Sequence, residues 1–268
     1  MAKTLVQTLD SDLQRSAGAL LLEIGADGAV KRRREEGCAK LRLPARLAPQ
    51  CSEAIIINTA GGLAGGDRFE FSASAAGDIC LTTQAAEKIY GALSAETRVT
   101  TRLNGEGEAR LLWLPQETIL FDGARLARSF EADLQGNATL LAAETVILGR
   151  RAMGESLTDF SLHDRWRIRR DGRLIHADDL GLDASRVKGA AALGGATAFA
   201  TVVFAGPDAE RFLEPLREIF DGWGGVSAWN GKLVARLAGV DGFDLRKPLI
   251  PALKLLAAPS ELPKVWSL

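Results

Sequence analysis

The sequence predicts a mainly β fold, in which antiparallel or coiled strands form a β-helix-like body and two helices follow in the C-terminal half. Short apolar or alternating runs, separated by turn residues, succeed one another from residue 19 to residue 176. Helical spacing of apolar residues appears only after residue 206. No repeat or linker divides the chain, so residues 1–268 are expected to form a single domain with the first 15 residues loosely attached.

The strands of the predicted body are joined by recognisable turns. The expected strands before residue 115 are Ala19–Ile24, Cys38–Leu43, Ala54–Asn58, Arg68–Ser74, Asp78–Thr83, Thr97–Leu103 and Ala109–Leu114. Residues 104–107, Asn-Gly-Glu-Gly, predict a hairpin between the last two of these strands. Residues 135–137 predict a second hairpin, between residues 124–134 and 138–148. The pair Asp171-Gly172 predicts a type I′ turn between strands 165–169 and 173–176.

Two helices and one further strand are expected after residue 206. Asp208 can cap a helix over 209–220, which Pro215 should kink or split. Residues 232–237 have the pattern of a strand. A second helix should begin between Pro248 and Pro251 and reach about Ala257, since leucines at 249, 253 and 256 share one face.

Composition excludes several functional classes. A net charge of −1 argues against binding to nucleic acid, and the basic runs at 31–34 and 165–170 are interpreted as solvated strand faces. Three scattered cysteines without a Cys-x-x-Cys pair favour a reducing compartment, and the expected location is the cytoplasm. Two histidines are too few for a closed metal cage. The uncharged stretch 189–206 is interpreted as a glycine-rich turn and a buried strand, so no membrane partner is expected.

The most unusual segment is the loop Asn58–Asp67, which contains two Gly-Gly pairs and ends in a carboxylate. So many glycines indicate positive φ angles or a very close backbone approach. The loop matches neither the Walker nor the dinucleotide pattern, because no lysine follows and the next segment looks like a strand. A ligand-binding β-domain that uses this loop stays open as a weaker alternative.

Paired carboxylates suggest a second alternative. Glu117 and Asp122 lie five positions apart, and a carbohydrate-active β-enzyme could use them as acid and base. Their spacing does not fix the distance between them, and no Ser-His-Asp arrangement is visible. The only tyrosine, Tyr90, and Trp166 are interpreted as core anchors.

Five blocks of sequence resemble the UreD (UreH) family of urease accessory proteins. They are Asn58–Asp67, residues 82–90 (TTQAAEKIY), residues 114–117 (LPQE), residues 149–155 (GRRAMGE) and residues 262–266 (LPKVW). The resemblance runs in order from about Gly37 to the C-terminus. Ala60 departs from the family pattern, in which serine or proline is commoner.

The resemblance implies a non-enzymatic scaffold that helps to load nickel into urease apoprotein, together with the helical accessory protein UreF and, through the complex, the GTPase UreG. It implies no tightly bound cofactor, only nickel in transit. We expect weak oxygen ligands for such transit, because a site that releases its metal should not be a cage of soft ligands. The candidate residues for nickel are Asp67, Glu87, Glu117 and Glu155. The candidates for binding the helical partner, in the C-terminal helices and tail, are Phe212, Leu249, Leu253, Leu256 and Trp266.

Overall fold

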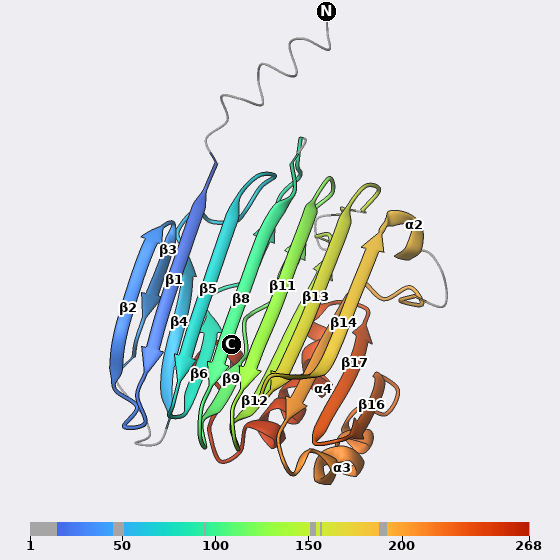
Figure 1. Ribbon diagram of the computed structural model, residues 1–268. Helices are drawn as coiled ribbons and strands as arrows, with labels where there is room; N and C mark the ends of the chain where they lie inside the picture. The colour runs from blue at the N-terminus through green and yellow to red at the C-terminus, as the bar shows by residue number, and fades with distance from the viewer. Residues whose placement is uncertain are drawn as a thin grey trace, which may run out of the picture.

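The protein consists of two β-sheets layered face to face, with helices on the outer side of the second sheet (Figure 1). The computed structural model describes residues 15–44, 51–93, 95–150, 154–155, 157–187 and 192–267. The expectation of a loosely attached N-terminus falls almost entirely on residues 1–14, which lie outside the described residues. The mainly β fold predicted from the sequence is confirmed.

The first sheet has seven strands in the order β14-β13-β11-β8-β5-β1-β2. Its central strands run parallel to one another, and antiparallel pairs occur only at the two edges, β1 with β2 and β13 with β14. Their bounds are β1 (Ala17–Ile24), β2 (Val30–Gly37), β5 (Arg68–Ala75), β8 (Thr97–Gly105), β11 (Arg125–Leu134), β13 (Ser161–Arg170) and β14 (Arg173–Asp183).

The second sheet has ten strands, and its main path is β16-β17-β15-β12-β9-β6-β4-β3. One half of β12 pairs with β9, and the other half pairs with β10, which in turn pairs with β7. The sheet is therefore interrupted at residues 84–86 and 114–117, which lie between these pairs. The bounds are β3 (Ala39–Arg42), β4 (Ser52–Asn58), β6 (Ile79–Thr83), β7 (Glu87–Ile89), β9 (Arg110–Trp113), β10 (Thr118–Leu120), β12 (Thr139–Leu148), β15 (Ala198–Ala205), β16 (Gly224–Trp229) and β17 (Lys232–Gly239).

The chain alternates between the two sheets from β5 to β13, so this part is a coil of parallel strands, as the β-helix-like prediction stated. The predicted hairpins at 104–107 and 135–137 are wrong, because β8 and β9 belong to different sheets, as do β11 and β12. Gly107 and Gly136 have the positive φ angles of tight turns, but these turns carry the chain from one sheet to the other. The Asp171-Gly172 hairpin is confirmed, with φ angles of 48° and 78°.

Helices follow in the C-terminal third. The first expected helix is split, as its proline predicts, into a 3₁₀ turn η2 (Ala209–Phe212) and α3 (Leu213–Ile219). The second helix, α4 (Gly242–Ala257), begins earlier than predicted, because the carboxylate of Asp241 accepts a hydrogen bond from the Asp244 amide at 2.8 Å and caps it. Two short elements, α2 (Ala184–Val187) and η3 (Lys264–Trp266), also lie in the described residues. None of the helices in the described ranges has the length and hydropathy needed to span a membrane.

Two hydrophobic cores hold these layers together. The core between the sheets contains a row of aromatic rings, in which Trp113 contacts Phe71 and Phe130, and Phe130 contacts Trp166. The second core lies between the second sheet and the helices. Trp166 is a core anchor as predicted, but Tyr90 is not, since 38% of its surface is exposed.

Candidate functional site

Four of the five sequence blocks meet at one place in the fold. Leu63 of the glycine loop forms a parallel bridge with Ile89, and the amide of Leu63 donates to the carbonyl of Lys88 at 2.8 Å. The amide of Glu87 donates to the carbonyl of Glu117 at 2.8 Å, which joins the second block to the third. The amide of Asp122 contacts the Glu155 carboxylate at 3.3 Å, which brings in the fourth. Asn58 and Glu155, which lie 97 positions apart in the sequence, thus belong to one region of the fold.

The glycine loop is a tightly packed corner. Gly62 has a φ angle of 147°, and a Cβ atom there would lie 2.4 Å from the ring of Tyr90. A Cβ atom at Gly65 would lie 2.5 Å from the carbonyl oxygen of Ala95. These glycines are needed because neighbouring segments occupy the space that a side chain would fill, so the loop is no open cradle for a phosphate.

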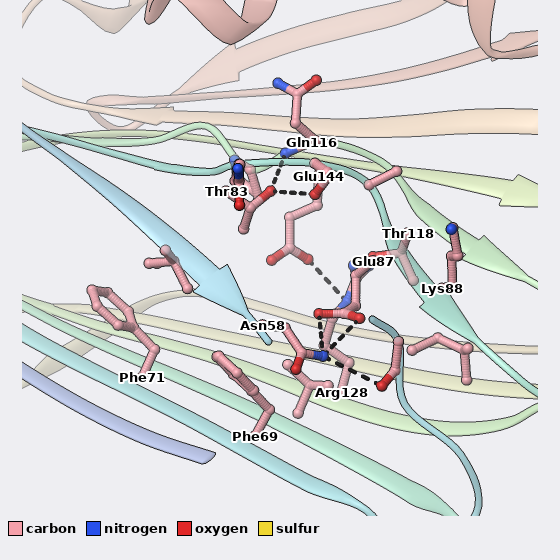
Figure 2. A pocket seen from close by; sticks show the side chains of 18 of the residues that line it. Asn58, Phe69, Phe71, Thr83, Glu87, Lys88, Gln116, Thr118, Arg128 and Glu144 are labelled. Carbon is pink, nitrogen blue, oxygen red and sulfur yellow. Dashed lines mark hydrogen bonds and ion pairs between the residues drawn. The ribbon is translucent and has the colours of Figure 1, made fainter. Parts of the chain in front are cut away.

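A cavity of about 230 Å³ lies between the two sheets, beneath the interruption of the second sheet (Figure 2). Its walls are largely apolar, with Phe69 and Phe71 contributed by β5. Its polar lining residues are Asn58, Thr83, Gln84, Glu87, Lys88, Thr101, Gln116, Thr118, Arg128 and Glu144. The exposed lining residues are Gly61, Gln84, Ala85 and Lys88, so the cavity opens to solvent at the interrupted part of the sheet.

Glu87 is the lining carboxylate without an ion-pair partner among the described residues. The side-chain amide of Asn58 donates to both of its oxygens, at 3.1 and 3.2 Å. Burial raises the pKa of Glu87 from its ordinary value of 4.5 to about 7, although the bond from Asn58 partly opposes this. Glu87 can therefore exchange a proton, or bind a cation in its place, near neutral pH.

Two further lining residues, Arg128 and Glu144, belong to a buried ionic cluster. Arg128 donates to both oxygens of Asp164, at 3.1 and 2.6 Å, and lies 3.0 Å from the carboxylate of Glu144. The indole of Trp113 donates to the other oxygen of Glu144 at 2.8 Å. Arg128, Glu144 and Asp164 are each less than 9% exposed, and burial raises the pKa of Glu144. Arg128 thus sets one positive charge against two carboxylates, of which Glu144 has the raised pKa.

Asp67 lies at the foot of the glycine loop and is not part of the cavity wall. One of its carboxylate oxygens accepts from the amide of Ser16 at 2.7 Å, and the other accepts from the amide of Ala64 at 2.8 Å. These contacts tie β1 to the loop. A role of Asp67 in nickel transit stays a prediction, and the geometry gives its carboxylate a structural task instead.

The other two candidate nickel residues also have partners outside the cavity. Glu117 points to the helical layer, where the guanidinium of Arg246 donates to both of its oxygens at 2.6 and 3.1 Å. Glu155 accepts from the amide and the guanidinium of Arg150, both at 2.9 Å, and this guanidinium lowers the pKa of Glu155. Of the four predicted residues, the cavity contains Glu87 alone.

Glu117 and Asp122, the acid and base of the carbohydrate-enzyme alternative, do not share a site. Whereas Glu117 pairs with Arg246, Asp122 accepts hydrogen bonds from the amides of Thr158 and Asp159 at 2.7 and 2.9 Å. Those two amides hold the pKa of Asp122 below its ordinary value. Neither carboxylate lines the cavity.

All five residues predicted to bind a partner lie inside the second core: Phe212, Leu249, Leu253, Leu256 and Trp266. Their burial explains the helical apolar pattern, and direct contact with a partner stays a prediction. The exposed face of α4 instead carries Phe243, with 78% of its surface exposed, and Lys247, whose ammonium lies 5.5 Å from the ring centre of Phe243. Val240, directly before α4, is 51% exposed.

Arg128, Glu144 and Asp164 were not predicted as site residues. One signal was available for Glu144, which is the only charged residue in the largely apolar run 139–148. Arg128 and Asp164 occupy inward positions of alternating strands, which the alternation alone could have identified.

The described residues contain no cluster of three His, Cys, Asp or Glu side chains suited to holding a metal ion. The basic run on β2 is neutralised, since Lys31 pairs with Asp27, Arg32 with Glu23, and the next two arginines with Glu35 and Glu36. This agrees with its interpretation as a solvated strand face.

Comparison with known proteins gives the same family as the sequence blocks. Residues 15–267 match the family model described as UreD urease accessory protein. The chain is 51% identical to the urease accessory protein UreD of Rhizobium leguminosarum bv. viciae over 240 residues, which cover 87% of this chain and 88% of the relative. It is 48% identical to UreD of Agrobacterium fabrum, covering 87% and 84% of the two chains, and 44% identical to UreD of Mesorhizobium japonicum, covering 95% of each. The chain therefore belongs to the family of UreD urease accessory proteins.

Proposed function

We propose that this protein is a non-enzymatic scaffold that binds urease apoprotein and assists the insertion of nickel into it. The family membership supports a role in urease maturation, because every relative reported above is named a urease accessory protein. The proposal depends on Glu87, a carboxylate that has no ion-pair partner among the described residues and lines a cavity open at the surface. We propose no tightly bound cofactor and an action in the cytoplasm, where the thiols of Cys38, Cys51 and Cys80 stay reduced.

Nickel passes through the cavity as cargo in this proposal, held briefly by Glu87. A carboxylate with the amide and hydroxyl oxygens around it binds a transition ion weakly and exchanges it fast, whereas thiolates and imidazoles would retain it. The Arg128 cluster does not retain the ion either, since its guanidinium already neutralises Asp164 and faces Glu144. Weak binding is what a protein that hands its metal onward requires.

The helical layer is the proposed contact for the helical accessory protein UreF, and UreG joins through that complex. The exposed aromatic ring of Phe243, with the ammonium of Lys247 beside it, offers a partner a large apolar anchor of a residue type that is enriched in interfaces. Arg246, between them in sequence, bonds to Gln116 of the cavity wall at 2.6 Å. A partner bound to α4 would thus lie close to the cavity.

Co-purification tests this function. Tagged full-length protein, co-expressed with urease apoprotein and UreF, should retain both. Phe243→Ser should lose UreF, whereas Leu174→Ser, which changes an apolar residue of β14 that is 47% exposed, should retain it. Failure of the unaltered protein to retain urease apoprotein in the presence of UreF would refute the scaffold role. If Phe243→Ser retained as much UreF as Leu174→Ser does, the α4 contact would be refuted.

A further inference from the structure

Residues 114–117 cross the interruption of the second sheet, and the cavity wall is attached to them. The amide of Gln116 donates to the hydroxyl of Thr83 at 2.9 Å. The amide of Glu87 donates to the carbonyl of Glu117 at 2.8 Å. Both Thr83 and Glu87 line the cavity, so the position of this crossing segment fixes where they lie.

The helical layer holds the same crossing segment from the other side. Arg246 of α4 donates from Nε and Nη2 to the two oxygens of Glu117, at 2.6 and 3.1 Å, and from Nη2 to the side-chain oxygen of Gln116 at 2.6 Å. The indole of Trp266 donates to the carbonyl of Leu114 at 2.9 Å, and the Arg246 guanidinium lies 5.3 Å from the centre of its ring. Gln116 and Glu117 are only 7% and 8% exposed.

These bonds belong to the strong class of hydrogen bonds. A guanidinium that binds a carboxylate through two donors fixes orientation as well as distance, and exclusion of water strengthens the pair. Lysine could not replace it fully, because an ammonium has no planar fork of donors. Arg246 itself does not line the cavity, so any effect that it has on a bound cation travels through the crossing segment.

We propose that Arg246 is a positioning residue for the cation path: by fixing residues 114–117 it holds Glu87 and Thr83 in place at the cavity. The inference rests on the proposed function, since it concerns the same cavity. It also links the two halves of that function, because Arg246 lies on α4 between the exposed residues Phe243 and Lys247. A partner bound to α4 would therefore lie next to the residue that holds the crossing segment.

The test uses the full-length protein and Ni²⁺ itself as the probe. The affinity for Ni²⁺ is measured by competition with a fluorescent chelator, and amide hydrogen exchange is followed over residues 84–90. Arg246→Ala should weaken Ni²⁺ binding about tenfold, as loss of a residue that orients a ligand does, and should speed exchange of the Glu87 amide. Arg246→Lys should recover part of the affinity. Lys254→Ala, a control at an exposed residue of the same helix, should match the unaltered protein.

Arg246→Lys also guards against a failure of folding in Arg246→Ala, because it keeps a positive charge beside the buried carboxylate of Glu117. If Ni²⁺ affinity and amide exchange were unchanged in both Arg246 variants, the positioning role of Arg246 would be overturned and the proposed cation path would still stand. If Glu87→Gln bound Ni²⁺ as tightly as the unaltered protein does, the proposed cation path would be refuted instead.

Discussion

Replacing Glu87 by glutamine should stabilise the protein at pH 8 and leave its stability nearly unchanged at pH 4.5. Glutamine has the size of glutamate and can still accept the hydrogen bond from Asn58, but it carries no charge to bury. The change therefore isolates the cost of an ionised carboxylate in the cavity.

The magnitude follows from the pKa of Glu87, which burial raises from 4.5 to about 7. Between these two pH values the folded protein keeps a proton that the unfolded chain has released, so stability falls as the pH rises through this window. Each pH unit between the two pKa values corresponds to ~1.4 kcal/mol. Above pH 7 the ionised Glu87 thus costs about 3 kcal/mol, and Glu87→Gln should recover most of that amount.

Urea unfolding of both proteins, followed by tryptophan fluorescence at several pH values from 4.5 to 8, measures the difference. The gap in the free energy of unfolding should open between pH 4.5 and 7 and stay constant above it. A gap that is the same at all pH values would refute the reasoning, because it would mean that Glu87 titrates alike in both states. Retention of so costly a carboxylate would suit a residue that serves function and not stability.

Three further predictions concern the surroundings of the cavity. Arg128→Ala should destabilise the protein by about 3–5 kcal/mol in urea unfolding, because it leaves buried carboxylates without a counter-charge; a loss below 1 kcal/mol would contradict this. Gly62→Ala should cost several times more stability than Gly61→Ala, because a Cβ at Gly62 meets the Tyr90 ring whereas a Cβ at Gly61 meets nothing within 4 Å. Both changes add about 1–3 kcal/mol of backbone strain, so equal shifts of the two thermal midpoints would contradict the tight packing of the loop. Asp67→Ala should lower the thermal midpoint but leave the Ni²⁺ affinity of the folded protein unchanged, and weaker Ni²⁺ binding at full folding would restore Asp67 to the cation path.

Most of the strands were predictable from the sequence, but β7, β10 and β16 were missed, and the partners of the strands were not predictable. Alternation marks a strand equally well in a parallel and in an antiparallel pair. The turn at 135–137 has the chemistry of a hairpin, and Gly136 adopts the expected positive φ angle, yet β12 leaves the sheet to which β11 belongs. What decides this is burial on both faces of β12, which is a property of the whole fold.

The site was predictable in part for a similar reason. A carboxylate in a family block can face a cavity, as Glu87 does, or satisfy backbone amides, as Asp67 does, and sequence does not distinguish the two. The apolar face of α4 was correctly predicted, but it packs in the core. The exposed Phe243 does not belong to the leucine spacing by which that face was recognised. Burial had to be known before core and surface could be separated.

The decisive measurement is the nickel content of urease made in cells that contain nickel and all other accessory proteins. Urease should assemble with little nickel when the gene for this protein is deleted, gain nickel when the unaltered gene is restored, and gain markedly less with Glu87→Gln although the accessory complex still forms. Full nickel content in the deletion strain would contradict the scaffold role, and full content with Glu87→Gln would contradict a path through the cavity.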